Sequence, residues 1–179
     1  MAFQTVFKRY ELKYMLTVEQ KKKVVAAMMP YMKLDKYGRT TIRNLYFDTD
    51  SYLLIRRSID KPVYKEKIRI RSYHQATADS TVFVEVKKKY KHVVYKRRIS
   101  MPNKEAEAWL AGESHPDKQT QIANEIDYFR DYYGMLHPTV FLSYEREAYY
   151  ANDGTDFRVT FDDNILCRQE DLSLASEAY

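Results

Sequence analysis

Lys67-Ile68-Arg69-Ile70-Arg71 alternates basic and apolar side chains without interruption, within a segment that spans residues 63–73. Successive side chains of a β-strand point to opposite faces of its sheet, so this pattern predicts a strand with one basic and one apolar face. The apolar face requires a second layer to bury it, whereas the basic face requires water or an anion. The pattern therefore predicts a sheet that is covered by protein on one side only.

Six further segments show the same two-residue period and are expected to be strands: residues 7–14, 42–48, 81–89, 93–99, 139–148 and 156–162. Four stretches are expected to be helices: residues 17–29, 50–59, 103–111 and 118–133. The first of these begins with Thr17 and Gln20 at the spacing of a capping box. Runs of strands interrupted by helices predict an antiparallel α+β fold.

The length of 179 residues is that of one domain. We expect residues 1–163 to form it and residues 164–179 to form a weakly patterned tail. The single cysteine, Cys167, excludes an internal disulfide framework and a cysteine-based zinc site. There is no apolar run long enough for a transmembrane helix, and the charged N-terminal stretch lacks the apolar core of a signal peptide, so we expect a cytoplasmic protein.

The basic residues are concentrated on the polar faces of the expected strands. The acids on the same faces are Glu11, Glu85 and Asp162, and they are outnumbered by these basic residues: Arg9, Lys13, Lys65, Lys67, Arg69, Arg71, Lys87, Lys89, Lys96, Arg98, Arg146 and Arg158. A solvated sheet face usually mixes both signs, because like charges opposite one another on paired strands are destabilising. The excess of cations indicates a polyanionic ligand.

Two polyanions are plausible, nucleic acid and a phosphate chain. Surfaces that bind nucleic acid interleave cations with exposed aromatic side chains for base stacking. Here the tyrosines beside the basic rows fall mostly on the opposite, apolar faces, which favours a phosphate chain, and we expect no nucleic-acid partner. If the sheet closes into a barrel, the basic faces line its interior, where the acids are natural ligands for Mg²⁺ or Mn²⁺.

Several motifs resemble, in order, those of the VTC-type polyphosphate polymerase domain, a branch of the triphosphate tunnel metalloenzyme (CYTH-like) superfamily. The similar segments are Arg9-Tyr10-Glu11-Leu12-Lys13-Tyr14, Tyr46-Phe47-Asp48-Thr49, Lys67-Ile68-Arg69-Ile70-Arg71, Phe83-Val84-Glu85-Val86-Lys87, Tyr144-Glu145-Arg146-Glu147-Ala148-Tyr149 and Phe157-Arg158-Val159-Thr160-Phe161-Asp162. The resemblance implies an antiparallel tunnel of eight strands with helices packed outside. Its interior would bind ATP, triphosphate or polyphosphate with Mn²⁺ or Mg²⁺.

The resemblance also implies roles for particular residues. The catalytic set would be Lys13, Arg69, Arg71, Lys87 and Arg146. Further phosphate ligands would be Arg9, Lys67, Lys96, Arg98 and Arg158, and the metal would be held by Glu11, Glu85 and Asp162.

Two departures from the family pattern bear on function. Arg9 stands where CYTH proteins carry the first acid of Glu-x-Glu-x-Lys, which agrees with the VTC branch and argues against a two-metal triphosphatase. Nothing after Asp163 resembles the closing strand with its metal-binding Glu, so we expect the tunnel to lack that last strand. The expected function is a polyphosphate polymerase that uses ATP. The alternatives are a polyphosphate or nucleotide-binding module without catalysis, a triphosphatase and, least favoured, a nucleic-acid-binding sheet.

Overall fold

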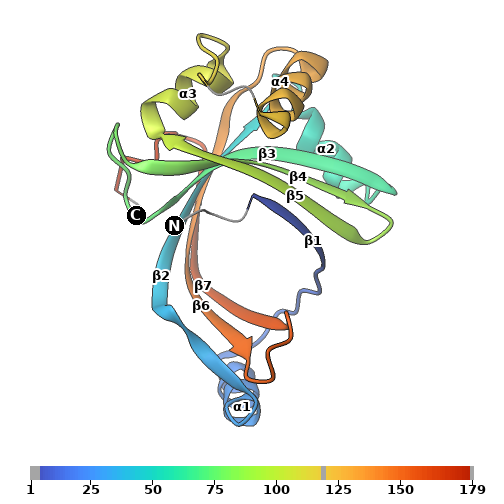
Figure 1. The fold of residues 1–179 in the computed structure, drawn as a ribbon, viewed down its shortest axis with the longest axis vertical. Coiled ribbons are helices and arrows are strands. Elements are labelled where there is room, and N and C mark those ends of the chain that lie inside the picture. The colour runs from blue at the N-terminus through green and yellow to red at the C-terminus, as the bar shows by residue number, and fades with distance from the viewer. Residues whose placement is uncertain (1–4, 118–119, 178–179) are drawn as a thin grey trace.

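One antiparallel sheet organises the molecule. The computed structural model describes residues 5–117 and 120–177, in which seven strands pair in the order β1-β5-β4-β3-β2-β6-β7 (Figure 1). Their bounds are β1 Val6–Tyr10, β2 Met32–Asp48, β3 Tyr64–Tyr73, β4 Thr81–Tyr90, β5 Val93–Pro102, β6 His137–Ala151 and β7 Arg158–Arg168. Each expected strand is present, and the α+β class is confirmed.

The sheet is curled but not closed. Its edge strands, β1 and β7, curve towards the same side of the molecule, and no pairing joins them within the described residues (Figure 1). The sheet is therefore an open, curled one, with the helices packed outside it as expected. The absence of an eighth strand from the described part of the chain agrees with the expectation of a tunnel without its last strand.

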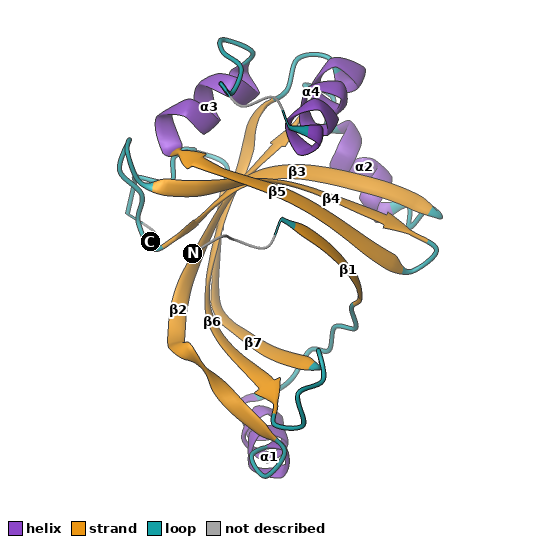
Figure 2. Cartoon of the chain, viewed as in Figure 1, coloured by secondary structure: helices purple, strands orange, loops and turns teal. Residues whose placement is uncertain are grey.

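Three helices cover the outer, convex side of this sheet, whereas α1 packs at the far end of β2, β6 and β7 (Figure 2). Their bounds are α1 Val18–Met28, α2 Leu53–Ile59, α3 Asn103–Ala111 and α4 Gln121–Tyr133. Thr17 and Gln20 form the expected reciprocal capping box at the start of α1. Gly112 ends α3 with a φ of 83°, a left-handed conformation that costs glycine little. None of the described helices combines the length and the apolar character that crossing a membrane requires.

The hydrophobic core lies between the convex face of the sheet and helices α2, α3 and α4. The apolar residues of the alternating strands point into it: Ile68 and Ile70 from β3 are fully buried there, as is Val84 from β4. From the helices, Trp109 and Ile126 pack against them. This arrangement leaves the other set of strand residues on the concave side, which we call the inner face.

Three boundaries differ from the sequence-based expectation. Strand β1 stops at Tyr10, whereas β2 begins at Met32 and continues through a register irregularity between Leu34 and Arg39. Strand β7 runs past residue 163, where we expected a tail to begin, and ends at Arg168.

The segment after β7 also packs against the sheet. Leu174 is completely buried, and the guanidinium of Arg43 donates hydrogen bonds to the backbone carbonyls of Leu174 (3.2 Å) and Ser176 (2.5 Å). The weak alternation of this part of the sequence does not reveal these contacts, because a buried arginine holds the segment through its backbone.

Candidate functional site

The register of β3, β4 and β5 gathers basic residues on the inner face. Arg69, Glu85 and Arg98 are cross-strand neighbours and form one row. Lys67, Lys87 and Lys96 form a second row, two residues away along each strand. Cross-strand neighbours on one face lie about 5 Å apart, so the pairing alone brings these side chains together.

Glu85 lies at the centre of this group, and none of its side chain is exposed to solvent. One of its oxygens accepts hydrogen bonds from Nε (2.9 Å) and Nη2 (2.7 Å) of Arg69. The other three basic groups near the carboxylate are Lys96 at 3.4 Å, Arg71 at 3.9 Å and Arg98 at 3.9 Å. Four basic side chains thus converge on a single carboxylate.

Neutral groups from β2 and β6 complete the hydrogen bonding of the two arginines of β3. Arg71 donates to the amide oxygen of Asn44 (3.0 Å) and to the hydroxyl of Tyr144 (3.1 Å), while Arg69 donates to the hydroxyl of Tyr46 (2.7 Å). These bonds fix both guanidinium groups in position without neutralising their charge. An anionic ligand would therefore meet hydrogen-bond donors that are already held in position.

The surroundings of the central group shift its pKa values strongly. Burial by itself would raise the pKa of Glu85, but Arg69, Arg71 and Lys96 outweigh it and hold that pKa far below its ordinary value. Burial would likewise lower the pKa of Arg69, but Glu85 more than compensates and raises it. For Lys96 desolvation prevails over the attraction of Glu85, and it lowers the pKa of the ammonium to about 8.

A second group of charges lies nearer the edges of the inner face. The Lys87 ammonium contacts the Glu11 carboxylate at 2.5 Å, and Lys13 lies 3.9 Å from the same residue but is 80% exposed. Arg146 of β6 forms a two-point contact with Asp162 of β7, at 2.6 and 2.7 Å. Each acid in this group already has a basic partner.

The three acids that the family resemblance assigned to a metal do not form a metal centre in the structure. Glu11, Glu85 and Asp162 pair with Lys87, Arg69 and Arg146 respectively. Among the described residues, no group of three or more His, Cys, Asp or Glu side chains is placed to hold a metal ion. The donor set therefore does not fit a preformed site for Mn²⁺ or Mg²⁺.

Most of the expected site residues whose side chains are described lie together on the inner face, with one exception. Arg158 is at its far end, where it stacks on the ring of Tyr150 (4.6 Å) and lies 3.8 Å from Asp35. Arg9 pairs with Val94 through the backbone, and its side chain falls outside the described residues. Lys67 does lie with the group, over the ring of Tyr46 at 5.4 Å.

The site also contains Asn44, Tyr46 and Tyr144, which were not among the expected site residues. The alternation of β2 could have indicated Asn44 and Tyr46, because Leu45 and Phe47, which alternate with them along the strand, belong to the core. Aromatic rings are thus more frequent on the inner face than we expected. They nevertheless pack against cations: Lys96 lies 4.0 Å from the centre of the Phe7 ring, and Arg98 lies 4.6 Å from that of Phe83.

Asp48, within one of the family motifs, has a structural part. Its carboxylate accepts hydrogen bonds from the backbone N–H groups of Thr49 (2.8 Å), Leu54 (2.9 Å) and Ile55 (2.9 Å). Leu54 and Ile55 lie in the first turn of α2, so the buried Asp48 fixes that helix to the end of β2.

Comparison with known proteins places the chain in a family. The model of the VTC domain matches residues 8–178, so the chain belongs to the VTC domain family, and the match includes the segment after residue 163. A search of curated proteins finds no significant sequence match.

Solved structures that are similar in fold include two bacterial proteins. One is a candidate adenylate cyclase from Bacillus halodurans, with 15% identity, a TM-score of 0.48, and coverage of 89% of this chain and 80% of that one. The other is a candidate adenylate cyclase from Vibrio parahaemolyticus, with 10% identity, a TM-score of 0.40, and coverage of 89% and 68%.

Proposed function

We propose that the inner face binds the phosphate chain of ATP and of polyphosphate, and that the protein transfers phosphoryl groups from ATP to a growing polyphosphate. The observation that carries this proposal is the convergence of four basic side chains on Glu85. Arg69, Arg71 and Lys96 alone already outnumber the single carboxylate of Glu85. Buried charge that is not neutralised is costly, and a phosphate chain offsets that cost.

The chemistry of phosphoryl transfer suits such a surface. The reaction depends on positioning and on neutralising the charge of the transferred group, and it requires no covalent nucleophile from the protein. Arg69 and Arg71 are held by hydrogen bonds to neighbouring strands, so they supply fixed donors to phosphate oxygens. Lys67 and Lys87, one row further along, supply point charge for the adjoining phosphates.

A divalent ion is expected to contribute less than the family resemblance implies. Because Glu11, Glu85 and Asp162 are engaged by basic residues, any Mn²⁺ or Mg²⁺ would be held chiefly by the phosphate oxygens. The same pairing favours the second candidate function, a polyphosphate-binding module without catalysis.

The test combines binding with turnover. Tripolyphosphate is titrated calorimetrically with and without Mn²⁺, and ATP with Mn²⁺ is assayed for both polyphosphate and free phosphate. If tripolyphosphate binds and polyphosphate is formed from ATP, the protein is a polymerase. If tripolyphosphate binds but ATP is not turned over, it is a binding module, and if free phosphate is the sole product, it is a triphosphatase. If tripolyphosphate does not bind at all, the proposed function is wrong in each of these forms.

Glu11 offers a test of whether its carboxylate serves a metal or competes with the ligand. Its contact with Lys87 occupies a cation that the phosphate chain would otherwise use. We therefore expect Glu11→Gln to tighten tripolyphosphate binding severalfold, and Lys87→Ala to weaken it about tenfold, the effect typical of a charge-assisted hydrogen bond. Both are measured by titration without metal. If Glu11→Gln instead weakens binding, and does so only when Mn²⁺ is present, Glu11 is a metal ligand.

Lys96 makes phosphate binding depend on pH. The pKa of its ammonium is lowered to about 8 in the free protein, and a bound anion favours the charged form. Affinity for tripolyphosphate is therefore expected to fall as the pH rises through about 8, because Lys96 must then take up a proton on binding.

Lys96→Arg is the control for this prediction, because arginine remains charged throughout the range. Tripolyphosphate is titrated into both proteins from pH 6.5 to pH 9.5. The ionisation of the ligand affects both pH profiles equally, so the difference between the profiles reports on Lys96 alone. Parallel pH profiles for the two proteins would contradict the role given to Lys96.

A further inference from the structure

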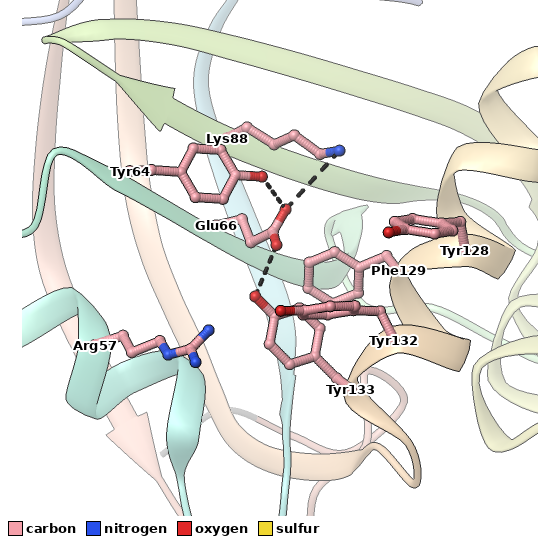
Figure 3. A pocket seen from close by; sticks show the side chains of 8 residues that line it. All are labelled: Arg57, Tyr64, Glu66, Lys88, Tyr128, Phe129, Tyr132 and Tyr133. Atoms are coloured by element: carbon pink, nitrogen blue, oxygen red, sulfur yellow. Dashed lines mark hydrogen bonds and ion pairs between the residues drawn. The ribbon is translucent and has the colours of Figure 1, made fainter.

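A separate pocket opens on the convex side of the sheet, between α2, α4 and the hairpin of β3 and β4 (Figure 3). Its volume is about 300 Å³, and its lining consists of Arg57, Tyr64, Glu66, Lys88, Tyr128, Phe129, Tyr132 and Tyr133. Glu66 and Lys88 are cross-strand partners. Each lies next in sequence to a lysine of the inner face, Lys67 or Lys87, so Glu66 and Lys88 point to the opposite side of the sheet. The pocket and the phosphate site are thus on opposite sides of the sheet.

The polar centre of the pocket is Glu66, whose side chain is only 9% exposed. One oxygen accepts a hydrogen bond from the hydroxyl of Tyr64 (2.6 Å) and the other from the hydroxyl of Tyr133 (2.7 Å). A carboxylate can accept about four hydrogen bonds, so further donors can be accommodated. Desolvation and these bonds to Glu66 raise the pKa of both tyrosines, which therefore stay neutral donors.

The wall of the pocket is aromatic. Tyr128 and Tyr132 are 66% and 61% exposed, and their rings lie nearly parallel, with 24° between the planes and 6.1 Å between the centres. Behind them, Tyr133 packs against the buried Phe129 at 4.7 Å. Large aromatic faces left open to solvent beside a buried carboxylate fit a planar ligand better than an aliphatic one.

The charge of the lining determines which sign of charge the ligand should carry. Lys88 lies 3.9 Å from Glu66, and the guanidinium of Arg57 extends from α2 towards the same space (Figure 3). Two cations against one carboxylate leave the pocket positive. This balance disfavours a cationic guest, although aromatic walls alone would suit one, and it favours a guest with a negative group.

We propose that this pocket binds a nucleoside monophosphate. The base stacks on the rings of Tyr128 and Tyr132, an amino group of the base donates to Glu66, and the phosphate contacts Lys88 and Arg57. A ring, a donor and an anion are the three features that the lining requires, and a mononucleotide carries all of them. The site would be a second nucleotide site, separate from the phosphate site on the inner face.

The test uses AMP, with adenosine and ribose 5-phosphate as probes that each lack one part. Calorimetric titrations are made with the inner face saturated by tripolyphosphate, so that plain phosphate binding there is suppressed; if tripolyphosphate does not bind, they are made without it. We expect AMP to bind at least about tenfold more tightly than either fragment, because each fragment forfeits stacking or charge contacts. Failure of AMP to bind, or equal binding of ribose 5-phosphate, overturns the proposal.

Variants then locate the bound AMP. Tyr132→Ala is expected to weaken AMP binding about tenfold through lost stacking, whereas Tyr37→Ala, which removes a comparably exposed tyrosine from β2, leaves it unchanged. Lys88→Met is expected to weaken AMP binding and to leave adenosine binding unchanged. Binding of AMP that none of the pocket variants alters would place the nucleotide elsewhere and contradict the proposal, while leaving the function of the inner face untouched.

Discussion

Glu85→Gln is expected to lower the free energy of unfolding by about 3–5 kcal/mol, the cost typical of breaking a buried ion pair by removing one partner. Among the described residues, Glu85 is the only carboxylate that lies within 4 Å of Arg69, Arg71 or Lys96. Glutamine keeps the size of the side chain but leaves these cations uncompensated. For the same reason the variant should bind tripolyphosphate more tightly, so the ligand should restore much of the lost stability.

Chemical denaturation with and without tripolyphosphate measures both effects. Glu125→Gln is the matched control, because Glu125 also pairs with an arginine of β5, Arg97 at 3.3 Å, but its side chain is 27% exposed. That change should cost at most about 1 kcal/mol. Equal losses in the two variants would mean that the burial of Glu85 has no special consequence.

The pH dependence of the free energy of unfolding provides an independent check of the role of Glu85, because its direction can be predicted. The pKa of Glu85 in the folded protein lies well below its ordinary value of 4.5, so its stabilising effect is fully present above about pH 4.5. It is lost as the pH falls from there towards the folded pKa, because the unfolded chain takes up the proton first. The difference in stability between the wild type and Glu85→Gln should therefore narrow below pH 4.5.

Alternation of side chains was sufficient to predict the strands and the basic surface. Arg69 and Glu85 belong to the basic face in their own strands, and pairing of β3 with β4 places them opposite each other. The family motifs added the expectation of an antiparallel tunnel with helices packed outside. The strands themselves could be predicted because a β-sheet expresses local periodicity directly.

The sequence could not predict which charges neutralise one another. Glu85 was expected to hold a metal, but its position among four basic residues depends on the register of three strands at once. Glu11 meets Lys87 although β1 ends one residue before it, so no strand pairing could have indicated that contact. Likewise, the hydrogen bond between Tyr133 of α4 and Glu66 of β3 joins residues 67 positions apart, so it depends on how α4 packs on the sheet.

Ile70→Asp is expected to prevent folding, and Lys67→Asp is expected to leave the fold intact. Both residues lie on β3, but Ile70 is completely buried between the sheet and its helices, whereas Lys67 reaches solvent on the inner face. Removing a buried isoleucine costs about 2–5 kcal/mol, and an unpaired buried carboxylate adds several more. The sum is comparable to the whole stability of a domain, about 5–15 kcal/mol.

The two variants receive the same new residue, so they differ only in the face of the strand that carries it. Circular dichroism should show that Lys67→Asp melts cooperatively, while its affinity for tripolyphosphate falls because a cation has been replaced by an anion. Ile70→Asp should show no cooperative transition. A shift of β3 by one residue relative to its neighbours would exchange the two outcomes, since every side chain would then point to the other face. The pair of variants therefore tests the assignment of the inner face, on which both the phosphate site and the separateness of the aromatic pocket depend.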